Sequence, residues 1–519
     1  MKGLIHLSTL DIAVIVTYVV VLIAIAYWAS FSKKNKSDHL FTANKSLGWF
    51  AIGLTMWGTN VGPSMLIANA SSGYESGIVA GNFSWYAFPF ILLLAFVFAP
   101  RYLGAQVMTL PEYMGKRFGD KTRRYLAWYT IITILISWLG LTLFSGGIFM
   151  SQVLAIPLSV SIIVLVLISA AFVIAGGLKA IAYTNVFQML LLIGVSILLV
   201  VMAVIKVGGI QEIIRSTPVN YWKMFQPLDD PNFPWLAIVI GYPIMGVWFW
   251  CTDQSMVQAV LGSKDLRNGQ MGANFVAWLK LIDIPLFMIP GILAFILLPH
   301  LTNSTDAYLK LVEAVFPSGL IGLVIVVMMA ALISTVGSAL NSLSAVFTMD
   351  IYVKQYKPAA TNKEITSIGR IVVLAGALLS IFLAIGITYI QGLSFFNIFQ
   401  SVLGFIAPPM SIAFLFAVLW KKTSHRAINS VLTLGTFFSL SVGIAYYNKL
   451  IFTDLHFLYV SFFIFILLGI YVLGYSLLDK KSVTKLAKID YQPIKIDRNV
   501  KIAWFVLIIL MVALYLFFN

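Results

Sequence analysis

Long hydrophobic runs alternate with short polar segments along the whole chain. Each run is roughly 17–30 residues long, which is enough for an α-helix to cross the hydrocarbon core of a bilayer. Fourteen such runs occur, at residues 10–29, 47–71, 79–100, 125–154, 158–175, 186–205, 235–251, 272–298, 320–351, 370–387, 395–420, 427–447, 457–478 and 502–518. The pattern predicts an all-α membrane protein with fourteen transmembrane helices.

The composition narrows the possible functions. Sixty per cent of the 519 residues are hydrophobic and 10% are charged, whereas a soluble domain has about 25% charged residues. The single cysteine, Cys251, excludes an internal disulfide. The longest polar gap, residues 206–234, is too short for a soluble domain, and the five histidines have no metal-like spacing. We therefore expect no enzyme activity, no organic cofactor and no nucleic-acid partner.

The positive charge is unevenly distributed among the loops. The formal net charge is +15, and the first loop alone contains Lys33, Lys34, Lys36 and Lys45. If that loop is cytoplasmic, about 27 of the 34 Lys and Arg lie on its side of the membrane and about six on the other. Cytoplasmic loops carry the excess of Lys and Arg. The bias predicts an even number of spans, with both termini extracellular or periplasmic.

The lipid bilayer is therefore an expected partner. The basic segment 480–498 is interpreted as a solvated cytoplasmic loop, with a lipid-binding or regulatory patch as the alternative. Short loops and small size favour the inner (cell) membrane of a bacterium. The sequence does not indicate an oligomeric state.

Two spans contain residues that break helices. The second has Gly58, Gly62 and Pro63 near its middle, and the seventh has Pro243 ahead of the acid Asp253. Proline removes a backbone N–H and glycine weakens a helix, and freed backbone groups are tolerated in lipid only where they line a cavity or face an ion. A simple proline kink is the alternative for either span alone. Because each broken span begins a block of five, the pair indicates a transporter built from inverted repeats.

The ninth span carries a polar cluster. Ser334, Ser338, Asn341 and Ser342 fall at helical spacing on roughly one face. Small and hydroxyl-bearing residues often serve only close packing between membrane helices. Their oxygens, together with free carbonyls of the broken second span, would also suit a desolvated alkali cation.

Lys280 is the most anomalous single residue, because it lies inside the eighth span. An ionisable group at that depth costs at least a few kcal/mol and usually faces a cavity or a partner. Lys280 either forms a structural pair with Asp283 or Asp253, or donates hydrogen bonds to a polar substrate.

Three ordered motifs resemble one family. Residues 248–258, with the sequence WFWCTDQSMVQ, are similar to the aromatic-Trp-Cys-Thr-Asp-Gln motif of the sodium/glucose cotransporter branch of the sodium/solute symporter family. Residues 340–352 and 110–118 resemble two further signatures of that family. The resemblance covers nearly the whole chain.

The resemblance implies a LeuT-like fold with two inverted five-helix repeats. The segments would be 1–46 (a first peripheral helix and a cytoplasmic loop), 47–205 (repeat 1), 206–234 (an external loop), 235–420 (repeat 2) and 421–519 (three C-terminal helices). It also implies sodium-coupled symport by alternating access, with Na⁺ as the co-transported ion.

Carried over residue by residue, the resemblance places Na⁺ among five groups. These are the carbonyls of Gly58, Val61 and Ala331 and the hydroxyls of Ser334 and Thr335. Some relatives have a second sodium site that uses an acid, and here the matching position is Asn185. The missing charge argues for one Na⁺ per cycle.

The same transfer gives a substrate site and a gate. Positions matching the family's substrate residues are Asn60, Trp250, Lys280 and Gln400, and Asp253 has a coupling or structural role. Phe249, where sugar-carrying relatives have a gating tyrosine, forms the gate with Trp85.

Two further positions depart from the sugar-site pattern. Met65 replaces a Gln or His, and Ser84 replaces a Glu. These changes, with Phe249, remove hydrogen-bonding groups that buried sugar hydroxyls need. A sugar or polyol is the first expectation for the small polar substrate; sialic acid, an amino acid or a carboxylate is the alternative. A proton-coupled or sodium-independent transporter or sensor on the same fold is the alternative of another class.

Overall fold

The structure, a computed structural model, describes residues 8–30, 38–387, 395–479 and 496–519. Within these ranges the chain is helical, with two isolated β-bridges and no β-strand. The main helices are α1 (Thr9–Ser30), α3 (Trp49–Asn60), α4 (Pro63–Ser76), α9 (Asp120–Thr133), α10 (Thr142–Leu154), α11 (Leu158–Val207), α13 (Trp235–Val247), α14 (Gln254–Leu261), α15 (Leu266–Leu279), α16 (Ile289–Leu297), α18 (Leu320–Val346), α19 (Asn362–Ile387), α20 (Phe395–Leu419), α22 (Thr436–Tyr447), α23 (Phe457–Leu478) and α24 (Arg498–Phe517).

Many of these helices are long and apolar enough to cross a membrane. Nine helical runs in the described residues meet that test, and a tenth does if the bent pair Leu266–Ile282 and Ile284–Leu297 is one span. Two shorter apolar stretches, Thr9–Ile25 and Leu403–Leu419, lie in α1 and α20. The structure is therefore that of an all-helical, multi-span protein, and the count of fourteen stays a prediction.

Both predicted helix breaks are present. Helix α3 ends at Asn60 and α4 begins at Pro63, so the second span is two helices joined by two residues. The seventh span continues through Pro243 and a π-helical turn, Trp248–Thr252, before the chain becomes extended at Asp253. Its break therefore lies ten residues after the proline, where the Asp253 carboxylate accepts hydrogen bonds from the first amides of α14.

Two predicted spans, 158–175 and 186–205, are joined in the single 50-residue helix α11. Gly177 is the one non-helical residue inside it (φ 56°, ψ −151°). A Cβ at this position would lie 2.5 Å from the Leu40 carbonyl oxygen. Positive φ and close backbone approach both require glycine here.

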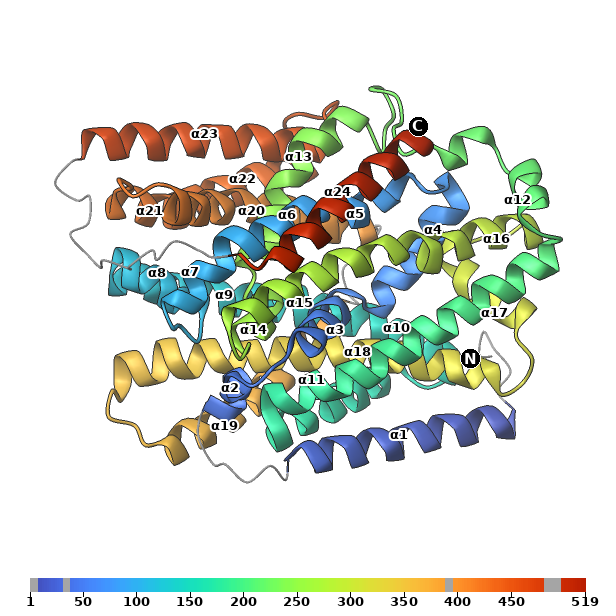
Figure 1. Cartoon of the computed structure of the whole chain (residues 1–519), viewed down its shortest axis with the longest axis horizontal. Helices are drawn as coiled ribbons and strands as arrows, with labels where there is room; N and C mark the ends of the chain where they lie inside the picture. Colours follow the sequence, from blue (N-terminus) through green and yellow to red (C-terminus); the bar gives the residue numbers. More distant parts are fainter. Residues whose placement is uncertain (1–7, 31–37, 388–394, 480–495) are drawn as a thin grey trace.

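Helix α18 lies at the centre of the molecule, and α1, α23 and α24 lie at its outside (Figure 1). In α18, 89% of the most apolar window is buried, compared with 22% in α24. A helix that is apolar all round but mostly exposed is stable in lipid rather than in water. The outer helices therefore present the lipid-facing surface.

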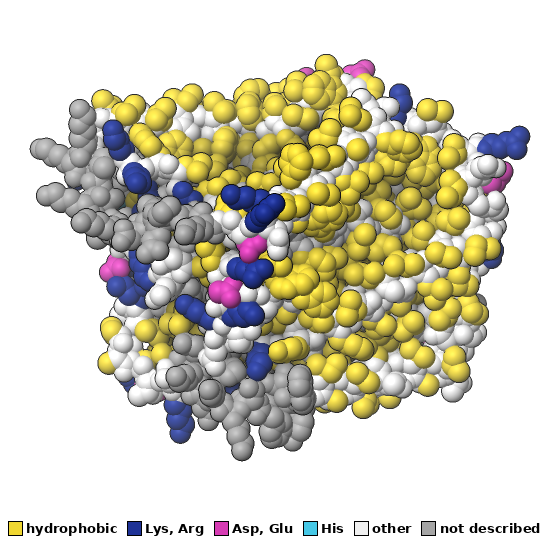
Figure 2. Space-filling model, in the orientation of Figure 1, with side chains coloured by type: hydrophobic (Ala, Val, Ile, Leu, Met, Phe, Trp, Pro, Cys, Tyr) yellow, Lys and Arg dark blue, Asp and Glu magenta, His cyan; other side chains and the backbone are white. Residues whose placement is uncertain are grey.

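Basic side chains are concentrated toward one end of the long axis. Figure 2 shows a face that is largely hydrophobic, with Lys and Arg gathered toward the end where α2 (Asp38–Thr42), α8 (Leu110–Phe118) and α14 lie. The start of α1 and the end of α24 lie at the opposite end (Figure 1).

Candidate functional site

A cavity of about 180 Å³ lies beside the break between α3 and α4. Its walls come from both halves of the chain. The lining residues are Thr59, Asn60, Gly62, Met65, Ala68, Asn69, Ala80, Phe83, Ser84, Trp138, Leu141, Thr142, Tyr242, Met245, Trp248, Phe249, Trp250, Lys280, Thr335 and Leu403.

One side of the cavity is polar and centres on Lys280. Lys280 begins a 3₁₀ turn at the end of α15 and is only 2% exposed. Its ammonium group donates hydrogen bonds to Asn60 Oδ1 and, at 2.6 Å, to Asp283 Oδ2. Trp57 Nε1 donates to the other carboxylate oxygen of Asp283 at 2.9 Å. The buried charge is thus compensated by Asp283 in a pair whose carboxylate is fixed on both oxygens.

Asp253, the other candidate partner of Lys280, is engaged elsewhere. Its carboxylate accepts from Trp138 Nε1 at 3.0 Å and from the backbone amides of Ser255 and Met256. Asp253 therefore joins the broken seventh span to the segment between α9 and α10, on which Trp138 lies.

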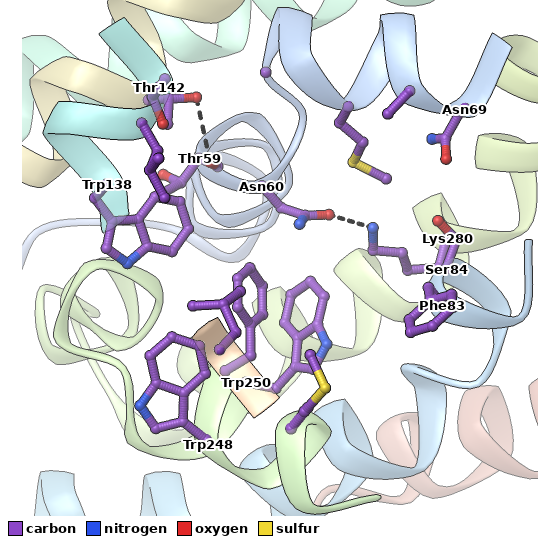
Figure 3. Close-up of a pocket in the computed structure, with 18 of the residues that line it drawn as sticks. Thr59, Asn60, Asn69, Phe83, Ser84, Trp138, Thr142, Trp248, Trp250 and Lys280 are labelled. Carbon is purple, nitrogen blue, oxygen red and sulfur yellow. Dashed lines mark hydrogen bonds between the residues drawn. The ribbon is translucent and has the colours of Figure 1, made fainter. Parts of the chain in front are cut away.

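The opposite side of the cavity is aromatic. Trp138, Trp248 and Phe249 line it, and the rings of Trp138 and Phe249 lie 5.5 Å apart at an interplanar angle of 32°. Trp250 joins the two sides, because the Lys280 ammonium lies 5.3 Å from the centroid of its ring. Figure 3 shows Lys280 and Asn60 pointing toward each other, with Asn69, Phe83 and Ser84 near Lys280 and with Trp138 and Trp248 on the other side of Asn60. The cavity thus offers hydrogen-bonding groups on one wall and flat apolar faces on the other.

The expected gate residue Trp85 is not among the lining residues. Its indole packs against Tyr515 and Phe518 of the C-terminal segment and donates to the Leu281 carbonyl at 3.4 Å. Gln400 lies on α20, but its side chain is outside the described part of the chain.

The sequence reasoning did not select Asn69. It lies on α4, four residues after Met65 and therefore one helical turn away on the same face. That spacing could have identified it, because polar residues are uncommon in apolar spans. Trp138 was missed for a different reason: it lies on a span with no break and no motif.

Oxygen atoms converge where α3 meets α18. The Gly62 N–H donates to the Asn60 carbonyl at 3.2 Å, and Pro63 has no N–H, so the carbonyls of Gly58 and Thr59 lose their usual helical donors. The Thr335 hydroxyl lies 3.5 Å from the Gly58 carbonyl, 3.2 Å from that of Thr59 and 3.0 Å from that of Ala331.

The other two expected ligands lie beside this group. Ser334 Oγ is buried without a hydrogen-bond partner in the described residues, and a Cβ on Gly58 would lie 3.2 Å from it. Val61 follows the last residue of α3, next to Gly62, whose Cβ would lie 3.5 Å from Thr335 Oγ1. Carbonyl and hydroxyl oxygens of this kind suit a hard cation.

Asn185 is fully buried on α11. Neither its amide nitrogen nor its amide oxygen has a hydrogen-bond partner within the described ranges. Unsatisfied buried polar groups are rare in folded proteins. Hydrogen bonds among the described residues therefore do not account for the burial of the Asn185 amide.

Comparison with known proteins identifies the family. The family model described as "Sodium:solute symporter family" matches residues 40–435. The chain belongs to the sodium:solute symporter family. This symporter is similar to the rabbit sodium/glucose cotransporter 1, with 31% identity over 91% of the present chain and 79% of the relative. It is also similar to the mouse sodium/myo-inositol cotransporter, with 31% identity over 81% of this chain and 65% of the relative.

The fold of the symporter also matches a solved structure. The substrate-bound outward-open state of a Na⁺-coupled sialic acid symporter superimposes with a TM-score of 0.79, at 20% identity, over 91% of this chain and 98% of the other. At 20% identity, this structural similarity shows that the two proteins share a fold.

The three sequence motifs hold this symporter's site together. Residues 248–258 supply three aromatic lining residues and the cap of α14. In residues 110–118, the Leu110 N–H donates to Gln254 Oε1 at 2.7 Å, which ties α8 to α14. At the end of residues 340–352, the fully buried Asp350 pairs with Arg123 at 2.6 Å. The motifs thus fix the elements around the cavity as well as the cavity itself.

Proposed function

We propose that this symporter carries a neutral sugar or polyol into the cell together with one Na⁺ per transport cycle. The observation that supports this most is the position of Asn60. It contributes to the polar wall through Lys280, and its neighbours in the chain, Gly58 and Val61, contribute two of the candidate sodium ligands. An ion bound at the break would therefore order the residue that the substrate contacts.

A neutral substrate is favoured by the charge of the site. Lys280 is the one charged side chain among the described lining residues, and Asp283 neutralises it. A carboxylate substrate would have to leave water without a net opposite charge to receive it, which costs several kcal/mol. The site therefore argues against sialic acid, acidic amino acids and other carboxylates.

The shape of the site suits a polyhydroxy compound. Hydroxyl groups would bond to Asn60, Asn69, Ser84 and Lys280, while the C–H face of the molecule would pack on the aromatic wall. Apolar walls with a few placed polar groups are typical of small-molecule sites. The relatives named for glucose and myo-inositol transport agree with this class.

The proposed ion ligands are the carbonyls of Gly58, Val61 and Ala331 and the hydroxyls of Ser334 and Thr335. The neutral amide of Asn185 in place of an acid supports one ion rather than two. Phe249, whose ring packs against that of Trp138, would be the gate over the substrate. We do not assign Trp85 to the gate, because its ring faces the C-terminal segment.

The proposed topology has fourteen transmembrane helices, with inverted repeats at 47–205 and 235–420 and the remaining segments as stated above. Both termini would be outside, in the inner membrane of a bacterium. The end of the molecule that is rich in Lys and Arg would be cytoplasmic.

Uptake into proteoliposomes tests the proposal. D-glucose, D-mannose, myo-inositol, sialic acid and glutamate are offered under an inward gradient of Na⁺ or of choline at constant pH. We expect Na⁺-dependent uptake of at least one neutral compound. A potential of 100 mV and a tenfold Na⁺ gradient together supply about 3.7 kcal/mol, enough for accumulation of several hundredfold. Equal uptake in choline would exclude sodium coupling, and uptake of only the carboxylates would exclude a neutral substrate.

A further inference from the structure

The short helix α5 (Asn82–Trp85) forms part of the cavity wall, because Phe83 and Ser84 line it. Helix α5 lies near the start of the helical run Val79–Gly104, and the first turn of a helix has backbone N–H groups without intrahelical partners. The placement of Phe83 and Ser84 therefore also depends on what holds this end of the run from outside the cavity.

A chain of hydrogen bonds connects α5 to the end of α24. The Asn82 side-chain amide donates to the carbonyls of Val79, at 2.8 Å, and Met224, at 2.7 Å. The N–H of Met224 donates in turn to the carbonyl of Phe518 at 2.7 Å. Asn82 and Met224 are both buried, so these bonds are shielded from water.

Aromatic contacts follow the same route. Trp85 meets Tyr515 edge-on, with ring centroids 6.0 Å apart, and lies 6.0 Å from the ring of Phe518. Trp222 stacks on Phe518, with ring centroids 6.5 Å apart and an interplanar angle of 23°. Such pairs add to the free energy of packing beyond the area they bury.

Helix α5 also contacts the turn that carries Lys280. Trp85 Nε1 donates to the carbonyl of Leu281, the residue after Lys280. The Trp85 side chain thus contacts both the end of α24 and the Lys280 turn.

We propose that residues 219–225 and the end of α24 act as an external brace that positions Phe83 and Ser84 in the substrate site. The brace sets the affinity for substrate and leaves the affinity for Na⁺ unchanged, because the candidate sodium ligands lie on α3 and α18, which contribute nothing to the brace. The position of the brace follows from the contacts above, and its effect on substrate affinity rests on the proposed function.

The first test needs no substrate. In Phe518→Ala, the contacts of Phe518 with Trp85 and Trp222 are lost. Leu516→Ala is the matched control, since Leu516 is on the same helix, two residues away, and 73% exposed. Amide hydrogen exchange of peptides covering residues 79–86 should be at least tenfold faster in Phe518→Ala than in the wild type and unchanged in Leu516→Ala. Equal exchange in the two variants would overturn the brace.

The second test measures function in proteoliposomes. The KM for Na⁺-driven myo-inositol and D-glucose uptake should rise several-fold in Phe518→Ala, and Phe518→Tyr, which keeps the ring, should restore it. Na⁺ affinity, measured without sugar by Na⁺-dependent tryptophan fluorescence, should stay within twofold of the wild type. A parallel loss of Na⁺ affinity would indicate general damage and overturn the proposal.

Failure of the brace can be distinguished from failure of the proposed function. If neither sugar is transported but exchange at residues 79–86 changes only in Phe518→Ala, the substrate assignment is wrong and the brace stands. If Phe518→Ala does not fold, Asn82→Ser takes its place, because the shorter side chain no longer reaches Met224. Hydrogen exchange and KM are then measured on Asn82→Ser, with the same expected results.

Discussion

Replacing Asp283 with asparagine removes one charge of a buried pair and nearly preserves the shape of the side chain. In the wild type, Lys280 and Asp283 are 2% and 1% exposed, and their charged atoms lie 2.6 Å apart. After the change, the Trp57 indole can still donate to an amide oxygen, but the ammonium of Lys280 keeps only uncharged partners, the Asn60 side chain and the Trp250 ring, whose centroid lies 5.3 Å from Nζ. Because both side chains are almost fully buried, solvent screening does little to soften the loss of the pair.

We expect the free energy of unfolding to fall by about 3–5 kcal/mol, the usual effect of leaving a buried charge without its partner. The assay is reversible unfolding in mixed detergent micelles, followed by tryptophan fluorescence. Asp283→Asn is compared with Lys280→Met and with the double variant Lys280→Met/Asp283→Asn. Since a neutral site has no uncompensated charge, the double variant should be more stable than either single variant.

The same substitution should change substrate selection. With the charge of Lys280 uncompensated, sialic acid should compete better for the site and neutral sugars no better than before. Double-variant losses equal to the sum of the single losses would refute the reasoning, since they would mean that the two charges do not interact. Unchanged competition by sialic acid would refute the argument that the pair excludes anions.

Three further predictions concern the ion site, the backbone and pH. Ser334→Ala/Thr335→Ala should raise the Na⁺ concentration for half-maximal uptake at least tenfold, and an unaltered Na⁺ dependence would exclude these hydroxyls as ligands. Gly177→Ala should destabilise the protein by about 1–3 kcal/mol because of its positive φ and its contact with backbone, while Gly194→Ala on the same helix, with open space around it, should not destabilise it. Burial lowers the pKa of His456, at the start of α23, to about 4; its unfolded pKa is higher, so stability should fall as pH decreases from about 6.5 to 4, and His456→Asn should flatten that part of the pH profile.

The sequence predicted the helix breaks because their causes are local. Pro63 cannot donate a backbone hydrogen bond in any environment, so the local sequence determines where α3 ends. The break in the seventh span was located less well, because Pro243 is accommodated within α13 and the interruption comes at Asp253. That position depends on the capping of α14 and on a bond from Trp138, more than a hundred residues away, and such a contact has no local signature.

Contacts between distant segments also explain why Trp85 lies outside the cavity, although the sequence led us to expect it at the gate. Trp85 follows Ser84 on the same helix, and neighbouring residues on a helix point in different directions. The sequence alone does not show which of the two side chains faces the cavity. Ser84 turns into the cavity, whereas Trp85 turns toward Tyr515 and Phe518. Only the position of α24, which packs beside α5 despite a separation of more than four hundred residues, decides between the two directions.

Lys280 illustrates how far a sequence argument reaches in a membrane protein. Its depth in a span showed that a partner was needed, and spacing offered Asp283, three residues on, which the structure confirms as the partner. The pairing does not remove Lys280 from the proposed substrate site, because its ammonium group also reaches Asn60 at the helix break. Asp283 thus compensates the charge of Lys280 within the membrane and, in the proposed substrate site, leaves no net positive charge to receive an anionic substrate. Stability and the proposed selectivity therefore depend on the same carboxylate.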